Sequence, residues 1–236
     1  MRDPDKATYY LTYSEWKRWD MNVFGEYSKK EDYYYRRLFR QYLQKHDTHI
    51  LEIGYGNGGL AGWLAKHYPS TKWSGVEIQP QLVKKASDAG FNAYSELEQI
   101  TNTCHLVIML DVLEHLTDYE IKVLFTKLEN IIEPNGKVIA RTPNGAGPMG
   151  LPNQTGDPTH ITSVSVNRLS FYLDRWEITE RGDLDPLWEG RVVKWFRNII
   201  KSFFRNLFTL VLRLIFSPLP KTFMERNLHF ILVKKA

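Results

Sequence analysis

Three acidic side chains stand at or near the ends of short apolar runs, and a histidine lies in a loop further along the chain. The acids are Glu52, Glu77 and Asp111. Carboxylates at the tips of neighbouring strands favour a cationic or hydroxyl-bearing ligand over an anionic one. His160 is of the side-chain type best suited to take up a proton near neutral pH. These residues predict a ligand site with a proton acceptor close to it.

Several glycines follow Glu52, and they indicate which kind of ligand the site would bind. Gly54, Gly56 and Gly59 satisfy the pattern G-x-G-x-x-G, which lets backbone approach an adenine-containing cofactor after a buried strand. A nicotinamide dinucleotide is one candidate. However, Glu52 would repel a pyrophosphate, whereas a cationic cofactor with an amino-acid part would be accepted. Glu77, 25 residues after Glu52, can accept hydrogen bonds from two ribose hydroxyls.

Short apolar runs alternate with helical patterns along the chain, which predicts an α/β fold with a doubly wound, mostly parallel sheet. We expect strands over 50–53, 72–78, 91–94, 106–110, 137–142, 176–181 and 227–234, and helices over 59–67, 80–89, 119–132 and 165–173. Pro134-Asn135-Gly136 predicts a turn between a helix and the next strand. Residues 1–46 are rich in aromatic side chains and predict a helical N-terminal cap, and residues 143–160 predict a loop.

Together these motifs resemble the class I S-adenosylmethionine-dependent methyltransferases over residues 48–175. The resemblance rests on Glu52-x-Gly54-x-Gly56-x-Gly58, on Glu77 and on Asp111-Val112-Leu113-Glu114-His115. It implies a Rossmann-like, seven-stranded sheet with an antiparallel last strand and S-adenosyl-L-methionine (SAM) as the cofactor. In this family pattern Glu52 and the glycine loop hold the methionine part, Glu77 the ribose, and the loop at Glu96 approaches the adenine. The expected cofactor-binding residues are Glu52, Gly54, Tyr55, Gly56, Asn57, Gly58, Glu77, Ile78, Glu96, Leu110 and Asp111.

The loop Gly156-Asp157-Pro158-Thr159-His160 supplies the candidate catalytic residues. A hydroxyl acceptor must lose its proton as it attacks a methyl group, and His160 is the expected general base, with Asp157 orienting its ring. A similar histidine-bearing loop occurs in ubiquinone-biosynthesis O-methyltransferases and in methyltransferases of bacterial polysaccharide clusters. The alternative is that His160 only bonds to backbone. Asn144 is a weaker candidate for positioning the acceptor.

Length and composition fit one α/β domain over residues 1–236, with 43% apolar and 25% charged residues. The single cysteine, Cys104, excludes an intramolecular disulfide, and a buried position entering a strand is expected for it. The polar N-terminus shows no secretory signal. No residues have the spacing of a metal site, so none is expected. These features predict a cytoplasmic protein.

The basic residues are concentrated in one segment. The net charge is +4, yet the seven basic residues between Gly190 and Thr222 have no acid among them, which leaves −3 for the remainder. This local charge argues against a nucleic-acid-binding surface. The seven are Arg191, Lys194, Arg197, Lys201, Arg205, Arg213 and Lys221.

Residues 191–217 combine these charges with apolar side chains at helical spacing. The charges recur too often for a spanning helix, and the pattern fits a helix in the interface of an anionic membrane. The alternatives are a helix that covers the sheet or forms a dimer. We therefore expect three parts: a helical cap (1–46), a Rossmann-like core (47–185 and 226–236) and a basic insertion (187–222). Similar basic, apolar insertions occur in some polysaccharide-cluster methyltransferases.

The sequence therefore predicts a SAM-dependent O-methyltransferase that acts on a sugar hydroxyl of a membrane- or lipid-linked glycan, peripheral on the inner face of the cytoplasmic membrane. Alternatives are O-methylation of a quinone precursor or another lipophilic small molecule, a nicotinamide-dependent enzyme, and a non-catalytic membrane adaptor that keeps the fold. The sequence does not indicate the oligomeric state.

Overall fold

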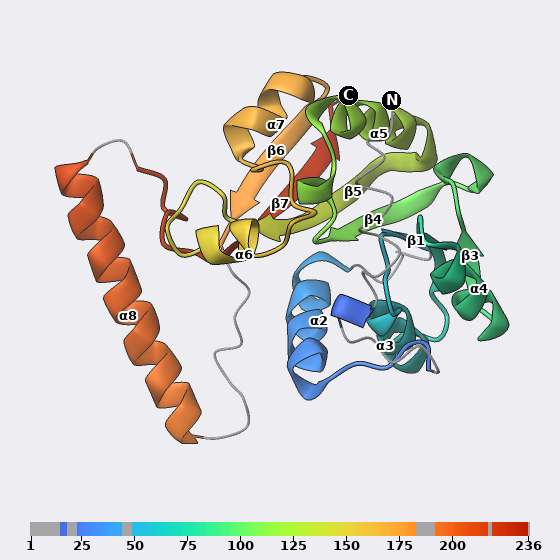
Figure 1. The fold of residues 1–236 in the computed structure, drawn as a ribbon, viewed down its shortest axis with the longest axis horizontal. Helices are drawn as coiled ribbons and strands as arrows, with labels where there is room; N and C mark the ends of the chain where they lie inside the picture. Colours follow the sequence, from blue (N-terminus) through green and yellow to red (C-terminus); the bar gives the residue numbers. More distant parts are fainter. Residues whose placement is uncertain (1–14, 18–22, 44–48, 183–191, 217–218, 236) are drawn as a thin grey trace.

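The computed structural model describes residues 15–17, 23–43, 49–182, 192–216 and 219–235. Within these residues a seven-stranded sheet forms the centre of the molecule, in the order β3-β2-β1-β4-β5-β7-β6 (Figure 1). Pairing is parallel except at β7, which runs antiparallel to β5 and β6. The doubly wound sheet with an antiparallel last strand is confirmed. The strands are β1 His49–Ile53, β2 Lys72–Val76, β3 Asn92–Tyr94, β4 Cys104–Leu110, β5 Ile132–Pro143, β6 Trp176–Arg181 and β7 Asn227–Lys234.

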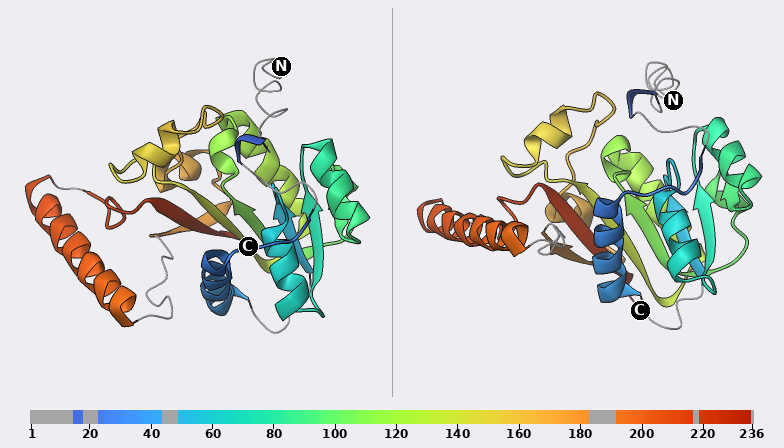
Figure 2. Two further views of the ribbon diagram at one scale, coloured as in Figure 1. Left: turned by 60° about the horizontal axis from the view of Figure 1, so that its bottom comes forward. Right: turned by 90° about the horizontal axis from the view of Figure 1, so that it is seen from below.

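Helices cover both faces of the sheet, so β4 is buried on either side (Figures 1 and 2). Leu106 and Ile108 of β4 pack toward α2 (Lys29–Tyr42), α3 (Gly59–His67) and α4 (Pro80–Asp88). The alternating residues, Val107 and Met109, pack toward α5 (Asp118–Ile131) and α7 (Val166–Tyr172). This two-sided burial explains the continuous apolar run in the sequence. Cys104 begins β4 and is buried, as expected.

Side-chain caps fix where two of the helices begin. Ser28 accepts a hydrogen bond from the amide of Glu31 at the start of α2, and the Glu31 carboxylate accepts one in return from the amide of Ser28. Thr117 and Glu120 form the same reciprocal pair before α5. These capping boxes satisfy amides that have no partner within the helix.

Two local expectations were wrong. Pro134-Asn135-Gly136 does not separate α5 from its strand, because β5 already begins at Ile132 and runs through these residues. The turn signal instead marks an irregularity: Asn135 has a φ of +66°, and the register with β4 shifts there. The expected loop after β5 contains a short helix, α6 (Leu151–Thr155). Two 3₁₀ turns, η1 (Leu97–Gln99) and η2 (Leu113–His115), were not expected.

The basic segment forms one long helix, α8 (Val192–Ile215), which lies beside the rest of the molecule and not across the sheet (Figures 1 and 2). An ion pair of 3.0 Å joins Arg205 of α8 to Glu225, which lies shortly before β7. Of the segment expected to form an N-terminal cap, residues 29–42 form helix α2. The aromatic residues Tyr9, Tyr10 and Tyr13, and the ends of the basic segment, lie outside the described residues.

Candidate functional site

A cleft of about 1760 Å³ opens at the carboxyl ends of the central strands. The loops after β1 and β4 border it, and these neighbouring strands lie where the sheet order reverses, which is the usual ligand position in doubly wound folds. Ten of the eleven expected cofactor-binding residues line the cleft. They are Glu52, Gly54, Tyr55, Gly56, Asn57, Glu77, Ile78, Glu96, Leu110 and Asp111.

The remaining residue, Gly58, forms part of the turn before α3 and is not among the residues that line the cleft. Its φ is +75°, and a Cβ on it would lie 2.2 Å from the ring of Phe24. Gly54, with a φ of +69°, faces a similar constraint, because a Cβ there would lie 2.6 Å from Val112 Cγ2. Both positions therefore need glycine, for conformation and for space.

Two glutamates give the cleft its acidic character, and both are buried. The carboxylate of Glu52 accepts a hydrogen bond from Trp73 Nε1 at 2.9 Å. Burial raises the pKa of Glu52 to about 8, against the opposing effect of the Trp73 bond, and the nearby charge of Glu77 adds to the rise. Burial also raises the pKa of Glu77, although backbone amides, including those of Gln79 and Gly56, donate to its carboxylate.

One amide of the glycine loop is already bonded to a carboxylate of the protein. Gly56 N–H donates to Glu77 Oε2 at 3.1 Å, so a carboxylate of the protein already occupies this donor. A pyrophosphate would also meet the buried carboxylate of Glu52. Because the Gly56 amide is already used and two buried carboxyl groups flank the loop, the geometry favours a cationic ligand over a dinucleotide.

Sequence reasoning missed the segment that crosses the loop. Phe24 packs edge-on against Tyr55 and Trp73, and the amide of Gly25 donates to Asn57 O at 3.0 Å. The chain passes so close to α3 that a Cβ on Gly62 would lie 2.0 Å from Gly25 O. The two glycines were the available signal, but they lie 37 positions apart and nothing in the sequence pairs them.

Asp111 is fixed by a second residue that the sequence did not indicate. It has a φ of +59°, and Arg141 Nε donates to its Oδ1 at 2.8 Å while Nη2 bonds the other oxygen. Burial raises the pKa of Asp111, but the charge and hydrogen bonds of Arg141 outweigh this and hold the pKa below its usual value. The Arg141 guanidinium also lies 4.8 Å from the ring centre of Tyr34. Asp111 therefore lines the cleft with an ionised carboxylate whose orientation is fixed by Arg141.

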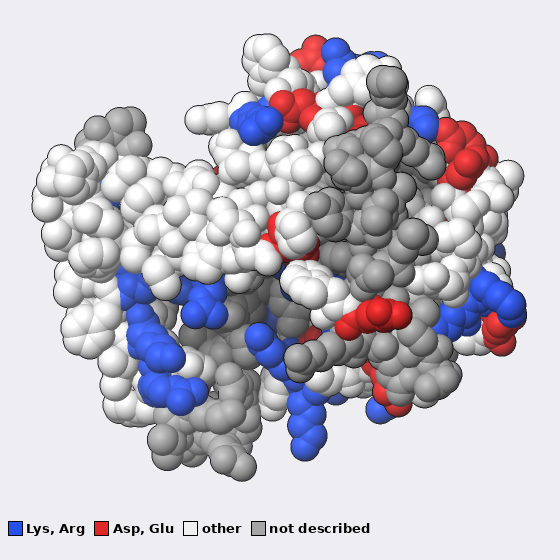
Figure 3. All heavy atoms as spheres, viewed as in Figure 1, with Lys and Arg blue, Asp and Glu red and all other residues white. Residues whose placement is uncertain are grey.

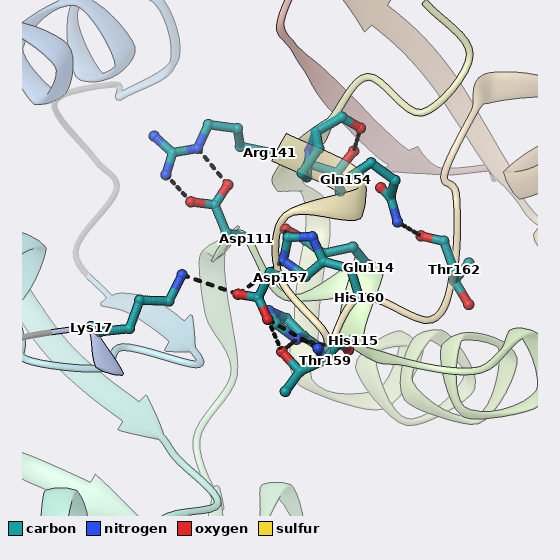
Figure 4. Close-up of polar contacts among 12 residues, drawn as sticks. Lys17, Asp111, Glu114, His115, Arg141, Gln154, Asp157, Thr159, His160 and Thr162 are labelled. Atoms are coloured by element: carbon teal, nitrogen blue, oxygen red, sulfur yellow. Dashed lines mark hydrogen bonds and ion pairs between the residues drawn. The ribbon is translucent and has the colours of Figure 1, made fainter. Parts of the chain in front are cut away.

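The loop histidine and its aspartate meet, together with residues of η2 (Figure 4). Asp157 Oδ2 lies 3.5 Å from His160 Nε2, and Oδ1 accepts from Thr159 N at 3.0 Å. The rings of His160 and His115 are 4.6 Å apart and edge-on. His115 lines the cleft, whereas His160 is not among the lining residues. The expected contact of Asp157 with His160 is thus present, one side chain back from the cleft surface.

Burial sets the protonation state of these histidines. It lowers the pKa of His115 to about 4, and the neighbouring His160 lowers it further. Burial also lowers the pKa of His160, against the opposing charge of Asp157. Lys17, from the N-terminal segment, forms an ion pair with Asp157 at 3.2 Å. Burial therefore favours the neutral form of both imidazoles, in which one ring nitrogen has a free lone pair.

Asn144 does not position an acceptor. Its side chain is buried, and Nδ2 donates to the carbonyls of Thr222 and Glu225 at 2.9 and 3.0 Å. These bonds tie the end of β5 to the segment before β7. The weaker candidate of the sequence analysis is therefore a structural residue.

The family model described as a methyltransferase domain matches residues 27–177 of this chain. The chain belongs to this methyltransferase family. A comparison with curated protein sequences found none that matches this chain.

Solved structures share its fold at low sequence identity. A SAM-dependent methyltransferase from Archaeoglobus fulgidus is 20% identical, with 96% of this chain and 100% of that chain covered and a TM-score of 0.62. The plantazolicin methyltransferase BamL, in complex with a triazolic desmethylPZN analog and SAH, is 14% identical over 99% and 92% of the two chains, with a TM-score of 0.59. Coclaurine N-methyltransferase, bound to N-methylheliamine and SAH, is 10% identical over 86% and 70%, with a TM-score of 0.56.

Proposed function

We propose that the methyltransferase binds SAM in the cleft and transfers its methyl group to a hydroxyl of a membrane- or lipid-linked sugar. The observation that carries SAM binding is the pair of buried glutamates, Glu52 and Glu77, on either side of a glycine loop whose amide is already used. Two of the similar folds, BamL and coclaurine N-methyltransferase, were solved with SAH. A cationic amino-acid-bearing ligand fits these charges, and a dinucleotide does not.

The lining residues support a role for each part of SAM. In this proposal Glu52 would receive the ammonium of the methionine part, and Glu77 would accept the ribose hydroxyls. Glu96 and Ile78, which are exposed at the cleft, would contact the adenine. When bound, SAM supplies a methyl group attached to a positively charged sulfur, and the leaving group is a neutral thioether. Alignment of the acceptor with this methyl is the main catalytic requirement.

Proton removal falls to the histidine cluster. As the acceptor oxygen attacks, its new bond to carbon forms while the carbon–sulfur bond breaks, and its hydroxyl proton must be taken up. His160, which lies 3.5 Å from Asp157, is the proposed base, and its ring contacts that of His115, which lines the cleft. Asp157 would stabilise the imidazolium that forms.

Two measurements test the core of this proposal. Calorimetry should detect SAM binding to the wild type and a weaker affinity in Glu52→Gln, whereas no binding would favour a non-catalytic adaptor. With an accepted substrate, SAH release should fall about 10²- to 10⁴-fold in His160→Ala, with SAM affinity unchanged. His105→Ala is the matched control, since His105 lies at the opposite end of β4 and pairs with Glu133 at 3.0 Å. Full turnover in His160→Ala would refute the base assignment.

Helix α8 supports a membrane-linked acceptor. Of the twenty large apolar side chains that are exposed in the described residues, twelve lie between Phe196 and Phe216. Exposed Phe203 and Phe204 are 62% and 61% accessible. Figure 3 shows blue Lys and Arg side chains gathered along one side of α8, next to its white, uncharged surface. An apolar face bordered by cations is the pattern of a helix that lies in an anionic membrane interface.

No helix in the described part of the chain is long and apolar enough to cross a membrane. We therefore propose that α8 binds the membrane from one side, peripherally at the inner face of the cytoplasmic membrane. Such a location would bring the cleft to glycan intermediates carried on lipids. A lipophilic quinone precursor is the second candidate acceptor, because the same helix would also bring the enzyme to it.

Vesicle flotation tests the membrane proposal. We expect the protein to float with vesicles that contain anionic lipid and to float less with purely zwitterionic ones. Reversing two charges of α8, Arg197→Glu with Lys201→Glu, should abolish flotation. Lys84→Glu is the control, because Lys84 is equally exposed but lies on α4. Equal flotation of all variants, or none by the wild type, would contradict the proposal. A panel of lipid-linked glycans and phenolic quinone precursors would then identify the acceptor.

A further inference from the structure

Glu114 is a buried carboxylate without the hydrogen bonds that such a group needs. It is 0% exposed, and neither carboxylate oxygen has a hydrogen-bond partner within the described residues. The nearest basic side chain is His160, whose Nε2 lies 3.9 Å from Oε1. An ionised carboxylate in such a position is costly unless a cation or a proton neutralises it.

The other two carboxylates of this region already have cations. Asp111 is bonded to Arg141, and Asp157 is paired with Lys17 at 3.2 Å. Glu114 has no such cation among the described side chains, because its nearest basic group, His160 Nε2, is 3.9 Å away.

Donor atoms of Glu114, His115 and His160 converge, all within 4.8 Å of one another (Figure 4). Thr159 O lies 3.2 Å from His115 Nδ1, a contact that requires the proton on Nδ1 and leaves the lone pair on Nε2. A metal-binding histidine usually has its other nitrogen bonded to a carbonyl in this way. Ligand atoms at the usual 2.0–2.2 Å from a metal are about 3 to 3.5 Å apart, so small side-chain rotations would complete the site.

We propose that Glu114, His115 and His160 bind a divalent transition-metal cation at the wall of the cleft. Two imidazoles and one carboxylate suit Mn²⁺, Fe²⁺ or Zn²⁺ better than Mg²⁺ or Ca²⁺, which prefer oxygen ligands alone. His115 and Asp111 line the cleft, so the free coordination positions would face the acceptor. The spacing of these residues could not show the site, because 45 positions separate His115 from His160.

The metal would change the chemistry of the proposed methyl transfer, and this consequence alone rests on the proposed function. A hydroxyl coordinated to a divalent cation has a lowered pKa and can release its proton to water in the cleft. His160 would then be a ligand and not the base. Either role predicts loss of turnover on substitution, so activity by itself does not separate them.

Metal binding is therefore measured directly. The full chain is dialysed against EDTA and titrated calorimetrically with MnCl₂ and, separately, with ZnCl₂, and the visible spectrum of a Co²⁺-loaded sample reports imidazole ligation. We expect one ion per chain in the wild type and an affinity at least about 100-fold lower in Glu114→Gln and His160→Gln, since loss of a ligand exceeds the usual loss from an outer partner. Circular dichroism checks that each variant folds.

Matched controls come from a pair of residues near the start of β4 and of β5. Glu133→Gln and His105→Gln break a histidine–glutamate pair of 3.0 Å and should leave metal affinity unchanged. No saturable binding by the wild type, or equal affinity in Glu114→Gln, would overturn the inference. SAM titrations on the same samples keep the two proposals apart. Metal binding without SAM binding would refute only the proposed function, whereas full methyl transfer in EDTA by a protein that binds the metal would refute only the catalytic role of the metal.

Discussion

The pKa of Glu52 makes a sharp prediction about how stability depends on pH. In the folded protein burial raises this pKa to about 8, whereas an unfolded chain has a value near 4.5. Between these values the folded state holds a proton that the unfolded state has lost. The free energy of unfolding must therefore fall as the pH rises from about 4.5 to 8, and stay at its lower value above that. The difference corresponds to at most roughly 5 kcal/mol.

Glu52→Gln isolates this contribution. The amide has the shape of the protonated acid, and its oxygen can still accept from Trp73 Nε1. We expect urea unfolding to give similar free energies for the two proteins at pH 5, and the variant to be several kcal/mol more stable at pH 8. Titrating groups that do not interact with Glu52 cancel in the difference. Glu133→Gln should follow the wild type at both values.

Ligand binding gives a second test of the same carboxylate. If SAM binds with its ammonium at Glu52, binding at pH 7 should ionise the acid and release a proton. Calorimetry in two buffers of different ionisation enthalpy measures that proton directly, and Glu52→Gln should release less. An equal pH dependence of stability in wild type and variant would refute the reasoning, as would equal proton release.

Two further substitutions test the contacts that hold the cleft. Gly62→Ala should cost about 1–3 kcal/mol and weaken SAM binding, because its Cβ would meet Gly25 O at 2.0 Å; thermal unfolding and calorimetry measure both. Gly90→Ala, at a φ of +84° with nothing within 4 Å, should cost only about 1–2 kcal/mol of conformational strain and leave SAM binding unchanged. Arg141→Met should cost about 1.5–3 kcal/mol in urea unfolding, because it leaves the Asp111 carboxylate without its charged partner. An unchanged midpoint in Arg141→Met would show that solvent replaces the guanidinium.

The features that could be predicted from sequence are those with a local signal. The glycine loop needs left-handed backbone at fixed positions, and β4 needs a continuous apolar run because it is covered on both faces. Strands β6 and β7 were predicted with the bounds that the structure shows. Ser165, the cap of α7, likewise marks its own helix. In each case the determining residues lie within a few positions of one another.

What could not be predicted depends on contacts between distant residues. Nothing in the sequence indicates that Arg141 bonds to Asp111, because only the pairing of β4 with β5 brings the two residues together. The approach of Gly25 to Gly62, and the convergence of His160 on Glu114, likewise require the folded chain. Pro134-Asn135-Gly136 misled because a turn signal also marks a bulge within a paired strand.

The placement of α8 in the chain has a consequence for how the enzyme meets its acceptor. The helix is inserted between β6 and β7, and Asn227, where the chain returns to the sheet, pairs with Pro143 and also lines the cleft. The chain thus returns from α8 to the sheet beside the ligand site. On a membrane surface, such an anchorage would confine enzyme and lipid-borne acceptor to two dimensions and raise their effective concentration. Turnover would then depend on the surface density of acceptor, and weak intrinsic affinity for the sugar would suffice.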